Sequence, residues 1–164
     1  MEQEDVFVEG LASAGIDFVA SLPSSSLAKF QERVAGDSRF TTVFVSNEGE
    51  GAAICAGAWL GGKKPALIME NSGITFASYS FLRLHAPLGI PLLVVMDHRG
   101  DIGDANWWAI AFGWSIGPML SSLRIPFSVV DSPDQFRSVA SKMWKTSLHS
   151  KYPCAIILRY GMKV

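Results

Sequence analysis

The sequence predicts an α/β fold, a three-layer doubly wound domain with a mostly parallel sheet of about six strands. Short apolar runs rich in β-branched residues alternate with longer segments of helical periodicity. The strongest run, residues 90–96, is apolar almost throughout, as in a parallel strand that is buried on both faces. Because no repeat or long linker interrupts the alternation, we expect residues 1–164 to form a single domain.

The first half of the chain is expected to contain two strands and three helices. Residues 2–14 have helical spacing, and Gly15 ends that helix. Residues 17–21 form a strand that Pro23 breaks, and the serines after it cap a helix that reaches about residue 34. Residues 40–45 form a buried strand. Ser46 and Asn47 then cap a helix of small residues that packs tightly against the sheet and ends near residue 60.

The second half continues the alternation. After a turn at residues 61–65, a third strand covers residues 66–69 and runs into a sharp turn, Asn71-Ser72-Gly73, and a helix to about residue 85. The central strand follows at residues 90–96, then a polar loop at 97–106 and a Trp-rich helix at 107–123. Residues 126–130 and 153–158 are the last strands, and the helix between them opens at Ser132.

Composition excludes several classes of function. Hydrophobic residues make up 49% of the chain, charged residues 18%, and the net charge is −1, so there is no electrostatic case for binding nucleic acid or an anionic membrane. No apolar run reaches the ~18–20 residues that span a bilayer, and the start is acidic, unlike a signal peptide. We therefore expect a cytoplasmic protein with Cys55 and Cys154 as reduced core thiols. Five Trp and ten Phe suggest a surface that another chain covers.

Glu48 is the main candidate for chemistry. It follows the second strand, in the first turn of the small-residue helix, and ligands of open α/β sheets bind at the carboxyl ends of strands. A carboxyl group among Gly and Ala packing residues is partly buried, which favours a neutral or proton-sharing state. The alternative is that Glu48 only stabilises the helix end.

The motif Asn47-Glu48, followed by Ala52-Ala53 and Gly57, resembles the pyrimidine-binding (PYR) domain of thiamine-diphosphate enzymes. The closest likeness is to the alpha subunits of sulfopyruvate decarboxylase and to the phosphonopyruvate decarboxylases. Three further stretches agree in order, and together they cover nearly the whole chain: Leu22-Pro23-Ser24-Ser25-Ser26-Leu27, Met69-Glu70-Asn71-Ser72-Gly73 and Asp97-His98-Arg99-Gly100.

The resemblance implies a cofactor, thiamine diphosphate, and a role for Glu48. In the family one Glu lies against a ring nitrogen of the aminopyrimidine and favours its imino tautomer, and Glu48 stands at that position. Pro23 and the turn of Asn71, Ser72 and Gly73 are implied to line the cofactor pocket. Ser25 and Arg99 are candidate substrate ligands, although Ser25 could instead cap a helix and Arg99 could instead anchor its loop.

The resemblance also implies a partner. The diphosphate and its Mg²⁺ need a second (PP) domain, for which 164 residues leave no room, so we expect a separate PP-type beta subunit and no activity without it. We also expect self-association through the PYR domain and a small 2-oxo acid as substrate. The compact Asp and Asn cluster in residues 100–106 does not match the family's metal signature, so no metal site is predicted in this chain.

Two departures from the family pattern leave the substrate open. The turn continues as Ile74-Thr75-Phe76 instead of Leu-Gly-Asn, and Trp108-Ala109 replaces a Gln-His pair before Gly113. A histidine that could bind substrate or relay protons is therefore missing. A carboligase subunit and a non-catalytic PYR-fold scaffold remain as alternatives. A flavodoxin-like binding domain is disfavoured, because no phosphate-binding glycine loop follows the first strand.

Overall fold

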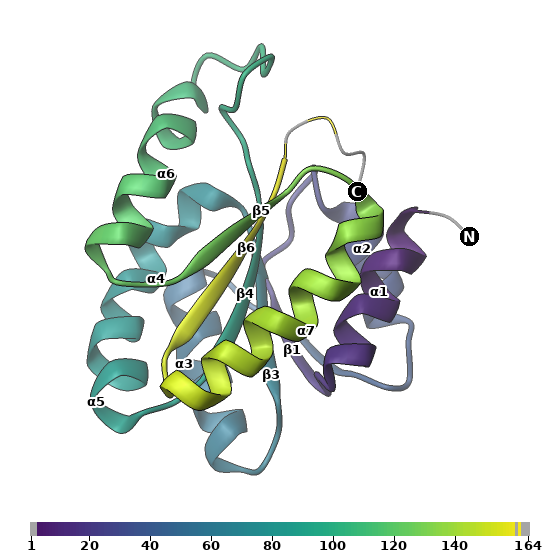
Figure 1. Ribbon diagram of the computed structural model, residues 1–164, viewed down its shortest axis with the longest axis vertical. Coiled ribbons are helices and arrows are strands. Elements are labelled where there is room, and N and C mark those ends of the chain that lie inside the picture. Colours follow the sequence, from purple (N-terminus) through teal and green to yellow (C-terminus); the bar gives the residue numbers. More distant parts are fainter. Residues whose placement is uncertain (1–2, 160, 162–164) are drawn as a thin grey trace.

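Six parallel strands form a central sheet in the order β2-β1-β3-β4-β6-β5 (Figure 1). The structure is a computed structural model that describes residues 3–159 and 161. The predicted α/β fold with about six strands is confirmed. The strands are β1 (Phe18–Ser21), β2 (Thr41–Phe44), β3 (Pro65–Met69), β4 (Leu92–Asp97), β5 (Phe127–Val130) and β6 (Pro153–Leu158).

Helices cover both faces of this sheet, which gives three layers (Figure 1). One face carries α1 (Gln3–Ala14), α2 (Ala28–Ala35) and α7 (Pro133–Ser150). The other carries α3 (Glu48–Leu60), α4 (Ile74–Ser80) and α6 (Ile110–Ser122). Three short helical turns complete this second layer: the 3₁₀ turn η1 (Asn71–Gly73), the π-helical turn η2 (Phe81–His85) and α5 (Ala86–Leu88).

The core is divided by the sheet because successive strand residues point to opposite faces. In β4, Val95 packs with the α1/α2/α7 layer, whereas Val94 packs with the α3/α4/α6 layer. All six residues of β4 are buried, as expected for the central strand of a sheet covered on both sides. None of the helices among the described residues has the length and hydropathy of a membrane-spanning segment.

Three local predictions are wrong. β2 is not a buried strand, because it lies at the edge of the sheet and both Thr41 and Phe44 are exposed. No serine caps α2: its N-cap residue is Leu27, which makes no capping hydrogen bond through its side chain. The Trp-rich helix begins at Ile110 instead of Trp107, since the preceding residues form turns that extend the β4–α6 loop.

The carboxyl ends of β1 and β3 mark the position where the chain changes direction across the sheet. These strands are neighbours, yet β1 leads to α2 on one face and β3 leads to η1 and α4 on the other. Such a switch point opens a crevice in which open α/β sheets bind ligands. The loops that follow β1, β2, β3 and β4 meet at this edge.

Candidate functional site at the carboxyl edge of the sheet

The first turn of α3 is fixed by its own capping bonds. Asn47 is the N-cap residue, and its Oδ1 accepts a hydrogen bond of 2.9 Å from the Glu50 N–H. Glu50 reaches back, and its Oε2 accepts bonds of 2.7 Å from both the N–H and the hydroxyl of Ser46. The bond to Asn47 satisfies a donor that the helix start leaves free, and the bonds from Ser46 lower the pKa of Glu50. Because Asn47 and Glu50 together make these capping bonds, Glu48 is left for another role.

The Glu48 carboxyl group is buried against Gly73 of η1. The Glu48 residue is only 7% exposed. A Cβ atom placed on Gly73 would lie 2.2 Å from Glu48 Oε1 and 2.4 Å from its Cδ. The carboxyl therefore occupies the space that any other residue at position 73 would need. The Glu48 carboxyl accepts no hydrogen bond from the part of the chain that the structure describes. Its oxygens are therefore available to bind an external partner.

Asn71 holds the η1 turn in place beneath Glu48. It is 1% exposed, its Nδ2 donates a 2.8 Å bond to the Arg99 carbonyl, and its N–H donates a 3.2 Å bond to Asp97 Oδ1. Its Oδ1 is buried and has no partner among the described residues. The hydroxyl of Ser72 donates a 2.9 Å bond to Glu70. The predicted turn thus forms, and it leaves one buried acceptor unused.

Asp97, at the end of β4, connects three of the loops at this edge. Its Oδ1 accepts the Asn71 N–H from the loop after β3, and its Oδ2 accepts the Ser26 hydroxyl from the loop after β1. Burial raises the pKa of Asp97 to about 6, with Glu70 adding to the effect, while the bonds from Ser26 and Asn71 and the nearby Arg99 oppose it. This carboxyl group therefore changes charge close to neutral pH.

The loop after β1 is held from behind by Gln31 of α2. The Gln31 Nε2 donates to the Ser21 hydroxyl at 2.9 Å and to the Leu22 carbonyl at 2.6 Å, and its Oε1 accepts the Ser24 N–H at 3.0 Å. Pro23 and Ser25 are exposed in this loop, beside a shallow cavity of about 470 Å³ that also includes Phe44 of β2. Ser25 does not cap α2, because Leu27 is the N-cap residue.

Arg99 is bound within its own loop. Its Nε donates a 3.2 Å bond to Asp104, which also accepts bonds from the Gly100 N–H and from the backbone and side-chain amides of Asn106. Burial alone would raise the pKa of Asp104, but these four donors hold it well below its usual value. Of the two roles left open for Arg99, the structure shows the loop anchor.

The same loop packs against α6 by direct backbone contact. Gly100 has φ +79°, and a Cβ there would lie 2.0 Å from the Ala109 carbonyl oxygen. A Cβ on Gly113 would lie 2.1 Å from the Gly100 carbonyl oxygen. His98 also joins this contact, since its Nε2 lies 3.2 Å from the Gly113 carbonyl oxygen. Both glycines are therefore needed for the close approach of loop and helix.

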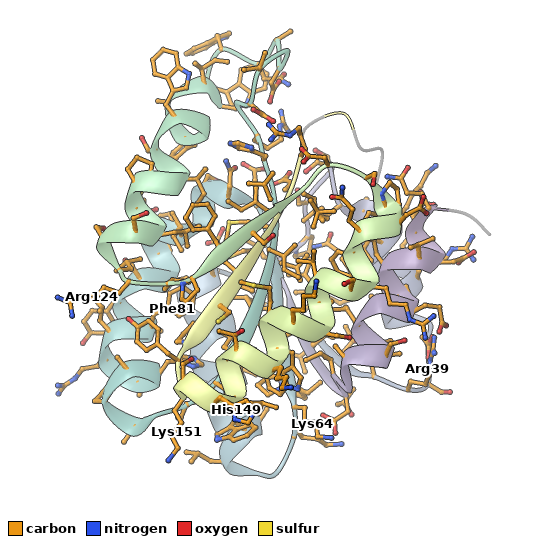
Figure 2. All side chains as sticks on the ribbon, viewed as in Figure 1. Arg39, Lys64, Phe81, Arg124, His149 and Lys151 are labelled. Carbon is orange, nitrogen blue, oxygen red and sulfur yellow. The ribbon has the colours of Figure 1, made fainter. Side chains whose placement is uncertain are left out.

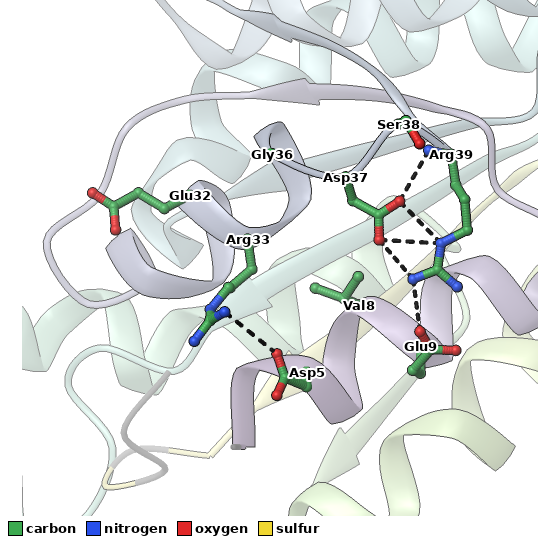
Figure 3. A pocket seen from close by; sticks show the side chains of 9 residues that line it. All are labelled: Asp5, Val8, Glu9, Glu32, Arg33, Gly36, Asp37, Ser38 and Arg39. Carbon is green, nitrogen blue, oxygen red and sulfur yellow. Dashed lines mark hydrogen bonds and ion pairs between the residues drawn. The ribbon is translucent and has the colours of Figure 1, made fainter. Parts of the chain in front are cut away.

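Two other groups of charged residues lie away from this edge. Lys64, His149 and Lys151 precede strands β3 and β6 and so gather at the amino-terminal edge of the sheet (Figure 2). A separate charged depression lies between α1 and the loop after α2 (Figure 3). Its Arg39 is paired with Glu9 and Asp37, each at 2.6 Å, which makes it an ion-paired surface and not a receptive site.

The structure thus brings together some predicted residues and separates others. Glu48, Asn71 and Gly73 lie together at the switch point. Pro23 and Ser25 lie on the neighbouring loop. Arg99 instead binds Asp104 within its own loop. Sequence reasoning missed Asp97. Its signals were its place at the end of the most apolar strand and in the stretch Asp97-His98-Arg99-Gly100, but it was given no role. Among the described residues, no group of three or more His, Cys, Asp or Glu side chains could hold a metal ion.

Known proteins resemble this chain over nearly its full length, although no protein-family model matches it. The alpha subunit of sulfopyruvate decarboxylase from Methanococcus maripaludis is 30% identical over 158 residues, which are 96% of this chain and 95% of that subunit. A phosphonopyruvate decarboxylase from Streptomyces hygroscopicus is 37% identical over 155 residues, which are 93% of this chain and 39% of that enzyme.

A solved structure shares the fold. The 2-oxoglutarate:ferredoxin oxidoreductase from Magnetococcus marinus matches 99% of this chain and 29% of its own, with a TM-score of 0.77 and 18% identity. That likeness supports the architecture, and the sequence relatives confirm the family that the four motifs indicated. The chain belongs to the family of sulfopyruvate decarboxylase alpha subunits and phosphonopyruvate decarboxylases.

Proposed function

We propose that this chain is the PYR-type alpha subunit of a thiamine-diphosphate-dependent 2-oxo-acid decarboxylase, completed by a PP-type beta subunit. Glu48 is its cofactor-activating acid. The observation that carries the proposal is the buried Glu48 carboxyl, which lies at the switch point of the sheet without a partner from the described residues. An unshared buried acid is costly to a fold, and a ligand that accepts its proton compensates for that cost.

The residues at this edge fit an aminopyrimidine. Such a ring has nitrogens that accept hydrogen bonds and an amino group that donates them. The Glu48 carboxyl can donate a hydrogen bond, and the unpaired Asn71 Oδ1 can accept one. Thiamine diphosphate supplies the electron sink for cleavage of the bond between the carbonyl and carboxylate carbons. Glu48 and the η1 turn would hold its pyrimidine end, and Pro23 would lie on the neighbouring loop.

The role of Glu48 depends on how rigidly its surroundings hold it. The Asn47 and Glu50 caps fix the helix start, and Gly73 leaves room for the carboxyl in one position. The Ser80 hydroxyl also ties α4 to α3, through a 2.8 Å bond to the Gly49 carbonyl. A general acid placed in this way contributes about 10²–10⁴-fold to a reaction rate.

A second chain is proposed to complete the site. The relatives that this chain covers almost end to end are named alpha subunits, whereas it covers about two-fifths of the phosphonopyruvate decarboxylases. The remaining functions, including retention of the diphosphate and Mg²⁺, would then come from the beta subunit. Exposed aromatic side chains near α6 offer a surface for it: Trp107, Trp108, Phe112 and Trp114.

CO₂ release tests this function. The chain is co-expressed with its beta subunit, supplied with thiamine diphosphate and Mg²⁺, and given a panel of 2-oxo acids that includes sulfopyruvate and phosphonopyruvate. We expect activity only when both chains are present. In Glu48→Gln the rate falls by roughly 10²-fold or more, because the amide cannot supply the acid proton.

Glu50→Gln is the matched control, since it makes the same change two residues away and its amide oxygen can still accept the Ser46 bonds. It should retain most of the activity. Equal rates in Glu48→Gln and the unmodified complex would remove Glu48 from the mechanism. A stable complex that binds the cofactor and releases no CO₂ from any of the acids would favour carboligation or the scaffold alternative.

A further inference from the structure

A chain of hydrogen bonds leads from the buried end of β4 to the cavity beside Pro23. The Ser26 hydroxyl donates to Asp97 Oδ2, and the Ser26 and Ser24 hydroxyl oxygens lie 2.9 Å apart. Asp97 is 6% exposed, while Ser24 is half-buried and lines the cavity beside Pro23. Three oxygen atoms therefore connect a buried carboxyl group with a cavity at the carboxyl edge.

We propose that Asp97, Ser26 and Ser24 form a proton relay that supplies the proton consumed in decarboxylation. This inference rests on the proposed function. Conversion of a 2-oxo acid to an aldehyde and CO₂ replaces a carboxylate by hydrogen and takes up one proton in each turnover. That proton needs a source close to the reacting carbon.

Each step of the relay moves one proton from one oxygen to the next. Asp97 Oδ2 gives its proton to Ser26 Oγ, Ser26 gives its own hydroxyl proton to Ser24 Oγ, and Ser24 gives its proton to the acceptor in the cavity. Each serine breaks one O–H bond and forms one, so both remain hydroxyl groups. Asp97 becomes a carboxylate, and a proton from solvent returns by the reverse path.

The surroundings suit both protonation states of Asp97. The Asn71 N–H holds Oδ1, which leaves Oδ2 to the relay, and a hydroxyl can donate to a carboxylate or accept from a carboxylic acid. The charged groups that act on Asp97 are Glu70, at the end of β3, and Arg99, two residues further along the loop after β4. Glu70 raises the pKa of Asp97 and Arg99 lowers it, with burial the largest influence.

Gln31 holds the other end of the relay. Two of its hydrogen bonds, to the Leu22 carbonyl and from the Ser24 N–H, fix the backbone on both sides of Pro23, and a third goes to the Ser21 hydroxyl. A proton relay needs its oxygen atoms at a constant separation. The buried Gln31 amide helps to keep that separation, because it holds the loop that carries Ser24 and Ser26. Ser25, which is exposed in the same loop, has no part in this chain of oxygens.

The first test titrates Asp97 in the isolated chain, by NMR with ¹³C-labelled aspartate carboxyl groups. We expect one aspartate to titrate near pH 6 and to disappear from the spectrum in Asp97→Asn. Ser26→Ala should raise this pKa, because it removes a donor to the carboxylate. Ser24→Ala should leave it unchanged, and so should Ser38→Ala, a control at the opposite edge. An ordinary aspartate pKa for Asp97, or no response to Ser26→Ala, would overturn the relay.

The second test measures products in the complex with its beta subunit, given a substrate that it decarboxylates and an added aldehyde. Without prompt protonation, the reacting carbon couples to the added aldehyde and forms a hydroxyketone. Ser24→Ala and Asp97→Asn should shift the product ratio towards hydroxyketone by roughly 10²-fold relative to Ser38→Ala. A purely structural Asp97 would lower the total rate and leave this ratio unchanged.

The two proposals fail in different ways. An unmodified complex that releases no CO₂ refutes the decarboxylase function and the relay with it. Normal CO₂ release with an unchanged product ratio in Ser24→Ala refutes the relay alone. Asp97→Asn should still fold, because its Oδ1 can accept the Asn71 N–H and its Nδ2 can donate to Ser26.

Discussion

Glu48 and Gly73 share a space that one added methyl group would fill. They are 25 residues apart in the chain. The contact forms because α3 begins, and β3 ends, at the same edge of the sheet. The Gly and Ala residues around Glu48 did indicate a buried carboxyl. The size of that space, and its closure by Gly73, could not be predicted from residue types. The choice of glycine in the Asn71-Ser72-Gly73 turn becomes understandable only when the Glu48 side chain is in place.

Gly73→Ala should therefore impair the site more than the fold. The new methyl group displaces the Glu48 carboxyl, and overpacking of this kind costs about 1–3 kcal/mol of stability. We expect CO₂ release in the complex to fall to nearly the level of Glu48→Gln, and the melting temperature to drop by a few degrees. In the Gly73→Ala background, Glu48→Asp should restore the melting temperature, because the shorter side chain relieves the overlap. Full activity in Gly73→Ala would mean that Glu48 does not need this position.

Between elements, the approach of α6 to the β4–α6 loop depends on two glycines. Sequence periodicity identified the helix but placed its start at Trp107, three residues early, because the backbone contact of Gly100 with Ala109 and Gly113 leaves no trace in hydropathy. The anchor role of Arg99 was one of two that the sequence left open, because its partner Asp104 could be recognised only once the loop was folded.

Gly113→Ala should destabilise the fold, whereas Gly117→Ala on the same helix should not. Alanine normally stabilises a helix interior by about 0.5–1 kcal/mol relative to glycine. A Cβ on Gly117 would lie at ordinary contact distance, 3.7 Å from Phe127, but one on Gly113 would overlap the Gly100 backbone. Urea denaturation should show a loss of about 1–3 kcal/mol for Gly113→Ala and none for Gly117→Ala. Similar stability of the two variants would contradict this packing.

His85 links η2 to α3 and makes stability depend on pH. Both ring nitrogens face carbonyls: Nε2 lies 2.9 Å from that of Ala52, and Nδ1 lies 3.1 Å from that of Ile90. Burial lowers the pKa of His85 below 6.5, although both carbonyls oppose the shift. The unfolded chain therefore binds more protons, and stability decreases as the pH falls through about 6.5 towards the folded pKa.

Asp97 makes stability depend on pH in the opposite direction to His85. Its pKa is raised in the folded state, so its contribution to stability increases as the pH falls through about 6. The effect of His85 should thus be clearest in the Asp97→Asn background, where the free energy of unfolding should decrease on acidification from pH 7. His85→Gln should flatten that dependence and His149→Gln, at an exposed position, should not. A dependence unaltered by His85→Gln would show that the buried imidazole is not its source.

At the scale of the whole molecule, strand order decides what the sequence can reveal. Alternating apolar runs predicted all six strands and the layers of helices, because burial on two faces imposes that pattern. They could not show that β2 is an edge strand, since order in a sheet is set by the crossovers. Asp97 was missed for the same reason: its partners Ser26 and Asn71 lie 71 and 26 residues away in the chain.

The exposed aromatic residues near α6 should belong to the interface with the beta subunit. Trp114 is 76% exposed, and α6 has no charged residue over its whole length. Trp114→Glu should leave the melting temperature of the isolated chain unchanged and weaken assembly by at least about tenfold, because it places a charge in an apolar contact. Leu60→Glu, at a 71% exposed position at the far end of α3, is the control. Size-exclusion chromatography of co-expressed chains measures assembly, and equal assembly of the two variants would exclude this surface.

The most direct test of the central claim is the rate at which the assembled enzyme exchanges the C2 proton of thiamine diphosphate for deuterium, measured by NMR after acid quenching. This reaction needs no substrate and reports cofactor activation alone. If Glu48 is the activating acid, Glu48→Gln should slow exchange by roughly 10²-fold or more, and Glu50→Gln should exchange like the unmodified complex. Exchange at an unchanged rate in Glu48→Gln, with the cofactor bound, would contradict the account.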